Sequence, residues 1–370
     1  MIHKSLKNPY TVLIVTGTFN EGKGKVSYFG KKIFESFYTA FLGELTHING
    51  GNLKDLDDCF NDISKYKIIV WMPNIDNSVD KYLSRIKAEN RTAILIQSKR
   101  NDLNKYSTFQ IVERMFKTHS NLCLEIKKEY NSVYNFRIID PLGNLWYSGD
   151  VIGHCSDKLA EIAKYLHSLT RIPSIQSTDK YDPIKIDNDF LEVVRFYGWR
   201  FSSLLNTAIN KERFLGNVST RCMSGFPSAK KGDIVLVSRR NVNKESITSD
   251  SFVPVKINKN GIIYYGDHKP SVDAPSQIML YRMYKNVNFI IHGHTYIDNA
   301  PFTKKYVPCG YLEEAQEILD LQIYSSAYNF SINLIGHGCI ILAKDLDYFA
   351  KLGMSCRRFP EDLSRLYLEV

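Results

Sequence analysis

The stretch Lys269-Pro-Ser-Val-Asp273-Ala-Pro-Ser-Gln-Ile-Met-Leu-Tyr-Arg-Met-Tyr-Lys-Asn-Val-Asn-Phe-Ile-Ile-His292-Gly-His294 decides our interpretation of the sequence, because it places a carboxylate, a helix, a strand and two histidines in order. Apolar residues recur at helical spacing over residues 273–284, and residues 288–291 form a short apolar run that suits a buried strand. Two histidines separated by one residue on an extended segment point to the same face. The stretch therefore predicts half of a metal site.

The other half is expected at His337, which lies between two glycines in the apolar run 332–342. Flanking glycines let the backbone come close to another group, so this run predicts a strand pair or a bulged strand around a ligand. A catalytic zinc takes three protein ligands and keeps one position open. His292 and His294 alone could be two unrelated histidines, but with His337 and Asp273 they predict a divalent metal site, with zinc as the first choice and manganese or another divalent ion as the alternatives.

The composition predicts a soluble globular protein of two domains. The chain has 370 residues, 44% of them apolar, and no run of about eighteen uncharged apolar positions that could span a membrane. Residues 1–10 lack the apolar core of a signal peptide, so we expect a cytoplasmic protein. Seven cysteines are scattered without C-x-x-C spacing, and we expect them to be reduced core residues.

The charge of the chain favours an anionic small-molecule substrate. The formal net charge is +9 and the isoelectric point is near 9.0. Lysines and arginines are spread over the whole chain without a basic run, so the sequence does not predict a nucleic-acid partner.

Residues 1–170 predict a Rossmann-like, doubly wound α/β domain. Helical patterns such as 27–42 and 109–117 alternate with buried-strand patterns at 11–16, 67–72, 92–97 and 136–140. The loop between Gly17 and Gly24 fits G-x-x-x-x-G-K, but Gly24 stands where a phosphate-binding loop needs Ser or Thr to hold magnesium. We therefore interpret the loop as a tight connection, with phosphate binding as the alternative.

Polar and turn-forming residues at 171–188 predict a linker, and residues 189–370 predict a second α/β domain. This domain is expected to open with a helix over 189–209 that is buried on one face. The apolar residues assigned to that face are Phe190, Leu191, Val194, Phe196, Trp199, Leu204 and Leu205. All the candidate metal ligands lie in this second domain.

From residue 214 to about residue 349 the sequence resembles the class II aldolase/adducin family. Four motifs match in order: Gly216-Asn217-Val218-Ser219 resembles G-N-[VI]-S, Asp233-Ile-Val-Leu-Val-Ser238 resembles the strand before the phosphate loop, Lys269-Pro-Ser-Val-Asp273 resembles K-P-S-S-[DE], and His292-x-His294 is followed by His337-Gly338. The resemblance implies the metal-dependent α/β fold that fuculose-phosphate aldolases and ribulose-phosphate 4-epimerases share. It also implies a homo-oligomer, commonly a tetramer.

The resemblance assigns roles to the site residues. Asp273 is expected to move the proton or to join the metal ligands. Expected substrate-binding residues are Asn217, Ser271 and the loop Ser238, Arg239, Arg240 and Asn241, which stands where the family has T-P-[TS]-G. An asparagine can adopt the positive φ that the lost glycine provided, and an arginine can bind phosphate or carboxylate through two hydrogen bonds.

The expected function is that of a metal-dependent lyase of the aldolase type, which acts on a phosphorylated or acidic keto-sugar through an enediolate. A 4-epimerase or dehydratase of the same family is an alternative. Val307-Pro308-Cys309 favours the epimerase branch, but Pro301 stands where that branch has an aspartate and Asp298 is only a nearby substitute. Two further alternatives are a non-catalytic binding or scaffold protein like adducin and a nucleotide-dependent enzyme driven by the first domain.

Overall fold

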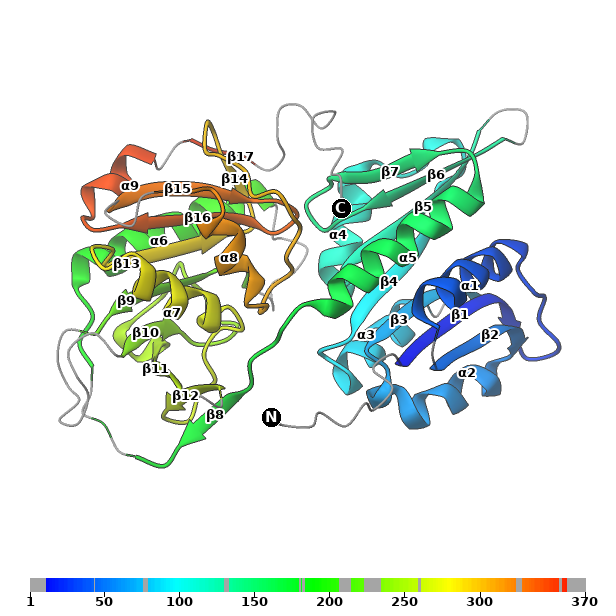
Figure 1. Cartoon of the computed structure of the whole chain (residues 1–370), viewed down its shortest axis with the longest axis horizontal. Coiled ribbons are helices and arrows are strands. Elements are labelled where there is room, and N and C mark those ends of the chain that lie inside the picture. Colours follow the sequence, from blue (N-terminus) through cyan, green and yellow to red (C-terminus); the bar gives the residue numbers. More distant parts are fainter. Residues whose placement is uncertain are drawn as a thin grey trace. The chain divides into compact units, whose positions relative to one another are not determined.

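The chain folds into two compact units, and among the described residues the first unit ends at Ser168 and the second begins at Leu169 (Figure 1). The structure is a computed structural model, and it describes residues 11–42, 44–75, 79–129, 133–179, 181, 184–205, 214–222, 234–258, 261–323, 328–352 and 355–357. No helix within these ranges is long and apolar enough to cross a membrane.

The first unit contains a seven-stranded sheet in the order β2-β1-β3-β4-β5-β6-β7. The strands are β1 (Thr11–Asn20), β2 (Glu44–Asn52), β3 (Ile68–Ile75), β4 (Ile94–Arg100), β5 (Leu122–Lys128), β6 (Tyr134–Ile139) and β7 (Leu145–Gly149). The first five are parallel to one another, β6 pairs antiparallel with β5, and β7 pairs antiparallel with β6. The order 2-1-3-4-5 is that of a flavodoxin-like doubly wound sheet, so the predicted Rossmann-like architecture is confirmed.

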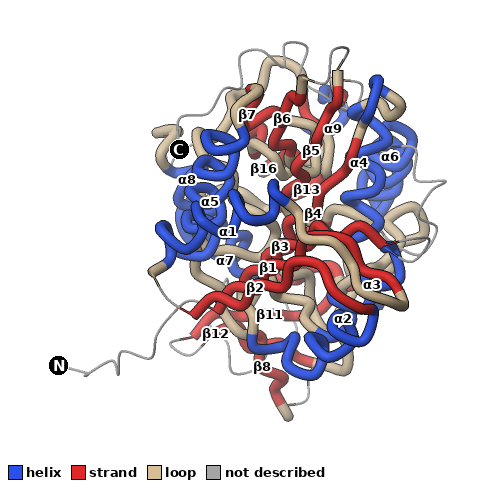
Figure 2. The backbone as a smooth tube through the Cα atoms, turned by 90° about the vertical axis from the view of Figure 1, so that its right-hand side faces the viewer, coloured by secondary structure: helices blue, strands red, loops and turns tan. Residues whose placement is uncertain are grey.

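Helices cover both faces of this sheet. They are α1 (Tyr28–Phe41), α2 (Leu53–Cys59), α3 (Val79–Glu89), α4 (Thr108–Thr118) and α5 (Ile152–Ser168), with short 3-10 helices at Phe60–Lys65 and Asp102–Asn104. Leu13 of β1 packs in one apolar cluster with Leu56 of α2 and Leu83 of α3, whereas α1 packs against α5. The strands are apolar at successive positions because both of their faces are buried. In Figure 2, β1, β2 and β3 run side by side.

The predicted glycine loop, which begins at Gly17 inside β1, is tightly packed. Gly17 has a φ of +85°, and a Cβ atom on Gly24 would lie 1.8 Å from the carbonyl oxygen of Thr18. Both positions therefore need glycine for backbone reasons, in agreement with our interpretation of the loop as a tight connection.

The second unit contains an eight-stranded sheet in the order β15-β16-β13-β9-β10-β11-β12-β8. The strands are β8 (Ser174–Ser177), β9 (Asn217–Arg221), β10 (Val235–Ser238), β11 (Phe252–Asn258), β12 (Gly261–Tyr265), β13 (Phe289–Gly293), β15 (Asn329–Leu334) and β16 (Gly338–Ala343). All neighbours are antiparallel except β12 and β8. A separate pair joins β14 (Tyr296–Ile297) to β17 (Cys356–Arg357).

The helices of the second unit form a layer on each face of its sheet. They are α6 (Asn188–Leu205), α7 (Ala274–Met283), α8 (Glu313–Leu319) and α9 (Asp347–Leu352), with a 3-10 helix at Ser249–Ser251. Ile291 of β13 packs in a cluster with residues of α6 and α9, and its neighbour Ile290 packs with residues of α7 and α8. Strand β13 is therefore buried on both faces, which fixes the position of the histidines at its end.

Two features of the second unit differ from the sequence prediction. The segment 171–188, predicted as a linker, contains β8, which pairs with β12. Helix α6 buries the stripe Phe190, Leu191, Val194, Tyr197, Phe201 and Leu205. The predicted buried face included Phe196 and Trp199, but these are 40% and 52% exposed, because they lie off the helical stripe that begins at Phe190. Residues 206–209 of the predicted helix lie outside the described residues.

The cysteines are free thiols. Five of them are buried, at Cys123, Cys155, Cys222, Cys339 and Cys356, whereas Cys59 and Cys309 are half-buried.

Candidate metal centre and active site

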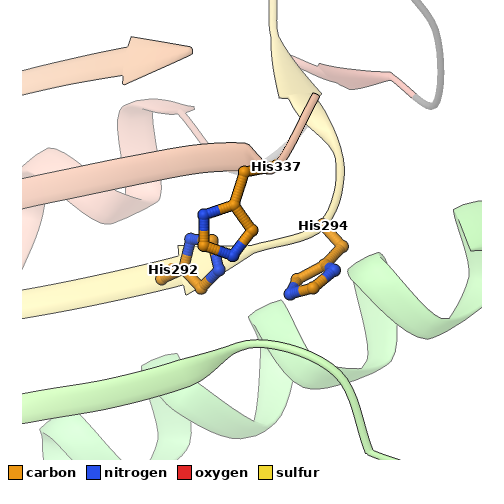
Figure 3. A group of neighbouring side chains, drawn as sticks. All are labelled: His292, His294 and His337. Atoms are coloured by element: carbon orange, nitrogen blue, oxygen red, sulfur yellow. The ribbon is translucent and has the colours of Figure 1, made fainter. Parts of the chain in front are cut away.

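The structure brings three histidines of the second unit together (Figure 3). His292 lies near the end of β13, His294 follows that strand, and His337 lies in the turn between β15 and β16. Their ring centroids are 4.4 to 5.1 Å apart, and one ligand atom from each ring lies within 4.8 Å of the others. All three side chains are buried.

Glycines allow these segments to approach. Strand β16 pairs with β13, with Gly293 opposite Cys339. Gly338 has a φ of +141°, and a Cβ atom there would lie 2.0 Å from the carbonyl oxygen of Gly293 and 2.8 Å from Cα of His294. A residue with a side chain cannot occupy this position unless the backbone moves. The glycine after His337 thus lets the turn lie directly against the His292–His294 segment.

The surroundings of His292 suit a metal ligand. Its Nδ1 lies 2.8 Å from the carbonyl oxygen of Cys339 and donates a hydrogen bond to it. Its Nε2 is buried and has no hydrogen-bond partner among the described residues. Burial, and then the charge of His337, lower the pKa of His292 to about 3, so its ring is neutral. A buried neutral nitrogen with a free lone pair fits a zinc-type ion.

His337 is oriented by a carboxylate that the sequence prediction missed. Its Nδ1 lies 2.5 Å from Oε2 of Glu314 in α8, and Glu314 Oε1 accepts a hydrogen bond from Ser276 at 3.1 Å. The Nε2 atom of His337 lies 2.9 Å from Sγ of Cys309. Burial lowers the pKa of His337, but Cys309 and Glu314 outweigh burial and raise it well above its ordinary value. A carboxylate behind a ligand histidine is the common outer partner at metal sites.

Asp273 lies at the start of α7, is 5% exposed and belongs to a buried network of hydrogen bonds. Its Oδ2 accepts a hydrogen bond from Asn217 at 2.6 Å and from Ser271 at 3.4 Å, and its Oδ1 accepts one from the backbone N–H of Gly310 at 2.7 Å. One carboxylate oxygen, Cys309 Sγ and a nitrogen of His337 lie within 4.8 Å of one another. Asp273 is therefore beside the histidine cluster.

The predicted substrate loop follows β10. Ser238 is buried and its Oγ accepts a hydrogen bond from Val218 at 3.1 Å. Asn241 has a φ of 58°, as the lost glycine required, and its side chain accepts a hydrogen bond from the backbone of Phe214 at 3.0 Å. Arg239 Nη1 lies 3.2 Å from Nε2 of His268. The backbone N–H of Arg240 donates to Lys269 at 2.9 Å, which ties this loop to the segment before Asp273.

Lys244 is a buried cation of this site that the sequence prediction missed. It is 7% exposed, and its Nζ donates a hydrogen bond to the carbonyl oxygen of Phe214 at 3.3 Å. Burial lowers the pKa of Lys244 to about 7, although the charge of Asp273 opposes the shift. No spacing pattern in the sequence distinguishes this lysine from the surface lysines.

Part of the chain matches a known family model. Residues 204–319 match the family model described as Class II Aldolase and Adducin N-terminal domain. This range includes Asp273, His292 and His294 but ends before His337. No curated protein matches the chain.

Several solved structures match parts of the chain. A DNA/pantothenate metabolism flavoprotein from Streptococcus pneumoniae has 14% sequence identity over 43% of this chain and 100% of its own, with a TM-score of 0.34. An L-fuculose 1-phosphate aldolase has 15% identity over 46% of this chain and 82% of its own, with a TM-score of 0.33. YgbL from Escherichia coli, a proposed aldolase/epimerase/decarboxylase, has 16% identity over 46% and 88%, with a TM-score of 0.30.

Proposed function

Because residues 204–319 belong to the class II aldolase and adducin family, we propose that the second unit is a metal-dependent lyase of the aldolase type that acts on a phosphorylated or acidic keto-sugar. One observation carries the proposal. The buried Nε2 of His292 has no hydrogen-bond partner among the described residues, and it belongs to a cluster of three imidazoles with a buried carboxylate beside it.

His292, His294 and His337 would hold a divalent ion, with zinc as the first choice and manganese as the alternative. When bound, the ion would act as a Lewis acid on the carbonyl oxygen of a keto-sugar. Asp273 would move the proton, because its carboxylate adjoins the cluster and its hydrogen bonds to Asn217 and Gly310 fix its orientation.

The anionic end of the substrate would bind at the loop after β10. Arg240 is the main candidate because a guanidinium matches phosphate and carboxylate oxygens with two parallel hydrogen bonds. The positive charge of Lys244 would also favour an anion, because the side chain is buried and water screens its charge poorly. The remaining proposed substrate-binding residues are Asn217, Ser238, Arg239, Asn241 and Ser271.

The alternatives predict different behaviour. A 4-epimerase or dehydratase would use the same ion and the same proton transfer, but Asp298, the substitute for the epimerase aspartate, forms an ion pair with Arg357 at 3.0 Å. An adducin-like scaffold would have no use for three clustered imidazoles. A reaction driven by the first unit would require nucleotide binding, which a titration with nucleotides measures directly.

We further propose a homo-oligomer that works in the cytoplasm.

A screen of ketose phosphates and acidic keto-sugars, with zinc or manganese present, tests the function. We expect metal-dependent release of an aldehyde, loss of that activity with a chelator, and lower metal content when His292 and His294 are both replaced by Ala. Asp273→Asn should keep its metal and lose roughly a hundredfold or more in kcat, the usual scale for a general acid or base. Asp267→Asn is the matched control, because Asp267 is exposed.

Two results would contradict these roles. One is cleavage that persists after the metal has been removed. The other is an Asp273→Asn variant that keeps both its metal and a near-normal kcat on the substrate that the screen identifies.

A further inference from the structure

Cys309 lies against the candidate metal centre, and the proposed function gives it no role. Its Sγ is 2.9 Å from Nε2 of His337. The other ring nitrogen of His337 contacts Glu314 at 2.5 Å, so Nε2 is the nitrogen that remains for an ion. Any ion on His337 would therefore have the sulfur of Cys309 as a close neighbour.

The segment that carries Cys309 is fixed in place. The next residue, Gly310, has a φ of +82° and donates its backbone N–H to Asp273 Oδ1 at 2.7 Å. Five of the other cysteines are buried, and the remaining one, Cys59, is in the first unit. The thiol of Cys309 is therefore set apart from the rest by both its position and its neighbours.

Cys309 is better suited than Asp273 to add a ligand to the three histidines. Both oxygens of Asp273 already accept hydrogen bonds, from Asn217 and from Gly310. The contact of Cys309 with His337 is made through the very nitrogen that an ion would take. The thiol could exchange this contact for a bond to the ion without breaking a hydrogen bond to any other described residue.

We propose that Cys309 is a further protein ligand of the ion held by His292, His294 and His337, an inference that rests on the proposed function. On binding, the S–H bond is replaced by a bond from sulfur to the ion, and the proton leaves to solvent. Thiolate is a soft ligand, so the site would select zinc, cobalt(II) or cadmium over magnesium, calcium or manganese. Asp273 would remain available for proton transfer, and a zinc ion with four protein ligands can expand to five-coordination to take the substrate oxygen.

Cobalt(II) loaded into the full-length protein in place of zinc tests this ligand. A cobalt–thiolate bond gives a near-ultraviolet charge-transfer band that nitrogen and oxygen ligands do not give. We expect this band in the wild-type protein and its loss in Cys309→Ser, while the visible bands of bound cobalt remain. Cys59→Ser is the matched control, because Cys59 is equally half-buried and lies in the first unit, and it should keep the charge-transfer band.

X-ray absorption on the zinc-loaded wild-type protein gives a second test that needs no variant. We expect one sulfur neighbour at about 2.3 Å beside nitrogen or oxygen neighbours at about 2.0 to 2.1 Å. Bound cobalt or zinc without a sulfur signal would overturn the role of Cys309 and leave the proposed function standing. A wild-type protein that binds neither ion would overturn both.

Discussion

Lys244 lies in surroundings that oppose its positive charge. Its ammonium group is nine-tenths buried, and Gly198 of α6 lies so close that a Cβ atom there would be 2.7 Å from Cβ of Lys244. Burial lowers its pKa to about 7, so a folded chain holds this proton less tightly than an unfolded one. Such a lysine reduces stability near neutral pH and is consistent with a role in binding an anion.

Replacement of Lys244 should change how stability depends on pH. The unfolded lysine keeps its proton up to its ordinary pKa of 10.5, whereas the folded one loses it near 7. Below the folded pKa, the cost of burying the charged lysine lowers the stability of the folded protein in full. This cost shrinks as the pH rises and is gone above the unfolded pKa. Between about pH 7 and about pH 9, the free energy of unfolding of the wild type should rise by about 2 kcal/mol relative to Lys244→Met.

Urea unfolding of both proteins at the two pH values measures this difference. Groups that the two proteins share cancel in the comparison. Lys285, an exposed lysine of the second unit, serves as the control, and its Met variant should show no such difference from the wild type. An equal change with pH in Lys244→Met and the wild type would contradict the buried, shifted amine.

Among the individual residues of the candidate site, the sequence predicted some and missed others. His292, His294 and His337 lie together, and Asp273 lies beside them, as the spacing and the glycines indicated. Glu314 and Cys309 contact His337, although they precede it by 23 and 28 residues in the sequence. No local pattern encodes such a contact, because it depends on where α8 and its preceding segment pack.

Among the elements, the turn between β15 and β16 positions one histidine of the candidate metal centre. It carries His337, and Gly338 at its end lies against Gly293 and His294. The sequence predicted those helices and strands whose apolar residues form a clear pattern, as in α1, α4, α7 and β13. Strand β2, with sequence ELTHINGGN, and the four-residue strand β8 lack such a pattern, because each forms an edge of its sheet and buries little apolar surface.

Gly338→Ala should weaken zinc binding about 10- to 100-fold, the scale for groups that orient metal ligands. The new Cβ atom would push the turn away from the carbonyl oxygen of Gly293 and separate His337 from the other two histidines. Gly153→Ala in α5 is the control, because a Cβ atom there meets nothing within 4 Å. This variant should keep its zinc affinity and gain roughly 0.5 to 1 kcal/mol in unfolding free energy.

Competition with a chelating dye measures the zinc affinity of both variants. A Gly338→Ala protein that binds zinc as tightly as the wild type would show that the turn tolerates the displacement.

The whole molecule combines two units with separate apolar cores. The proposed chemistry belongs to the second unit, which also exposes two aromatic side chains of α6, Phe196 and Trp199, with ring centroids 6.0 Å apart. Exposed aromatic pairs are typical of protein interfaces. This pair is our candidate for the surface at which copies meet in the proposed homo-oligomer.

Trp199→Glu should shift the protein toward the monomer, because the variant loses the indole ring and would place an unpaired carboxylate in a buried interface. Light scattering at micromolar concentration measures the mass of the wild type and of the variant. Tyr38→Glu, at an equally exposed aromatic residue of the first unit, is the control and should leave the mass unchanged. A wild-type protein that is already a monomer would contradict the proposed oligomer itself.

The hydrogen bond from His292 to the carbonyl oxygen of Cys339 determines which ring nitrogen of His292 carries the proton. A carbonyl only accepts, so it fixes the ring in the tautomer with its proton on Nδ1. The acceptor belongs to the backbone of β16, so any residue at position 339 that keeps the strand would select the same tautomer. Nε2 thus presents its lone pair before an ion arrives, and no proton has to move around the ring when the ion binds.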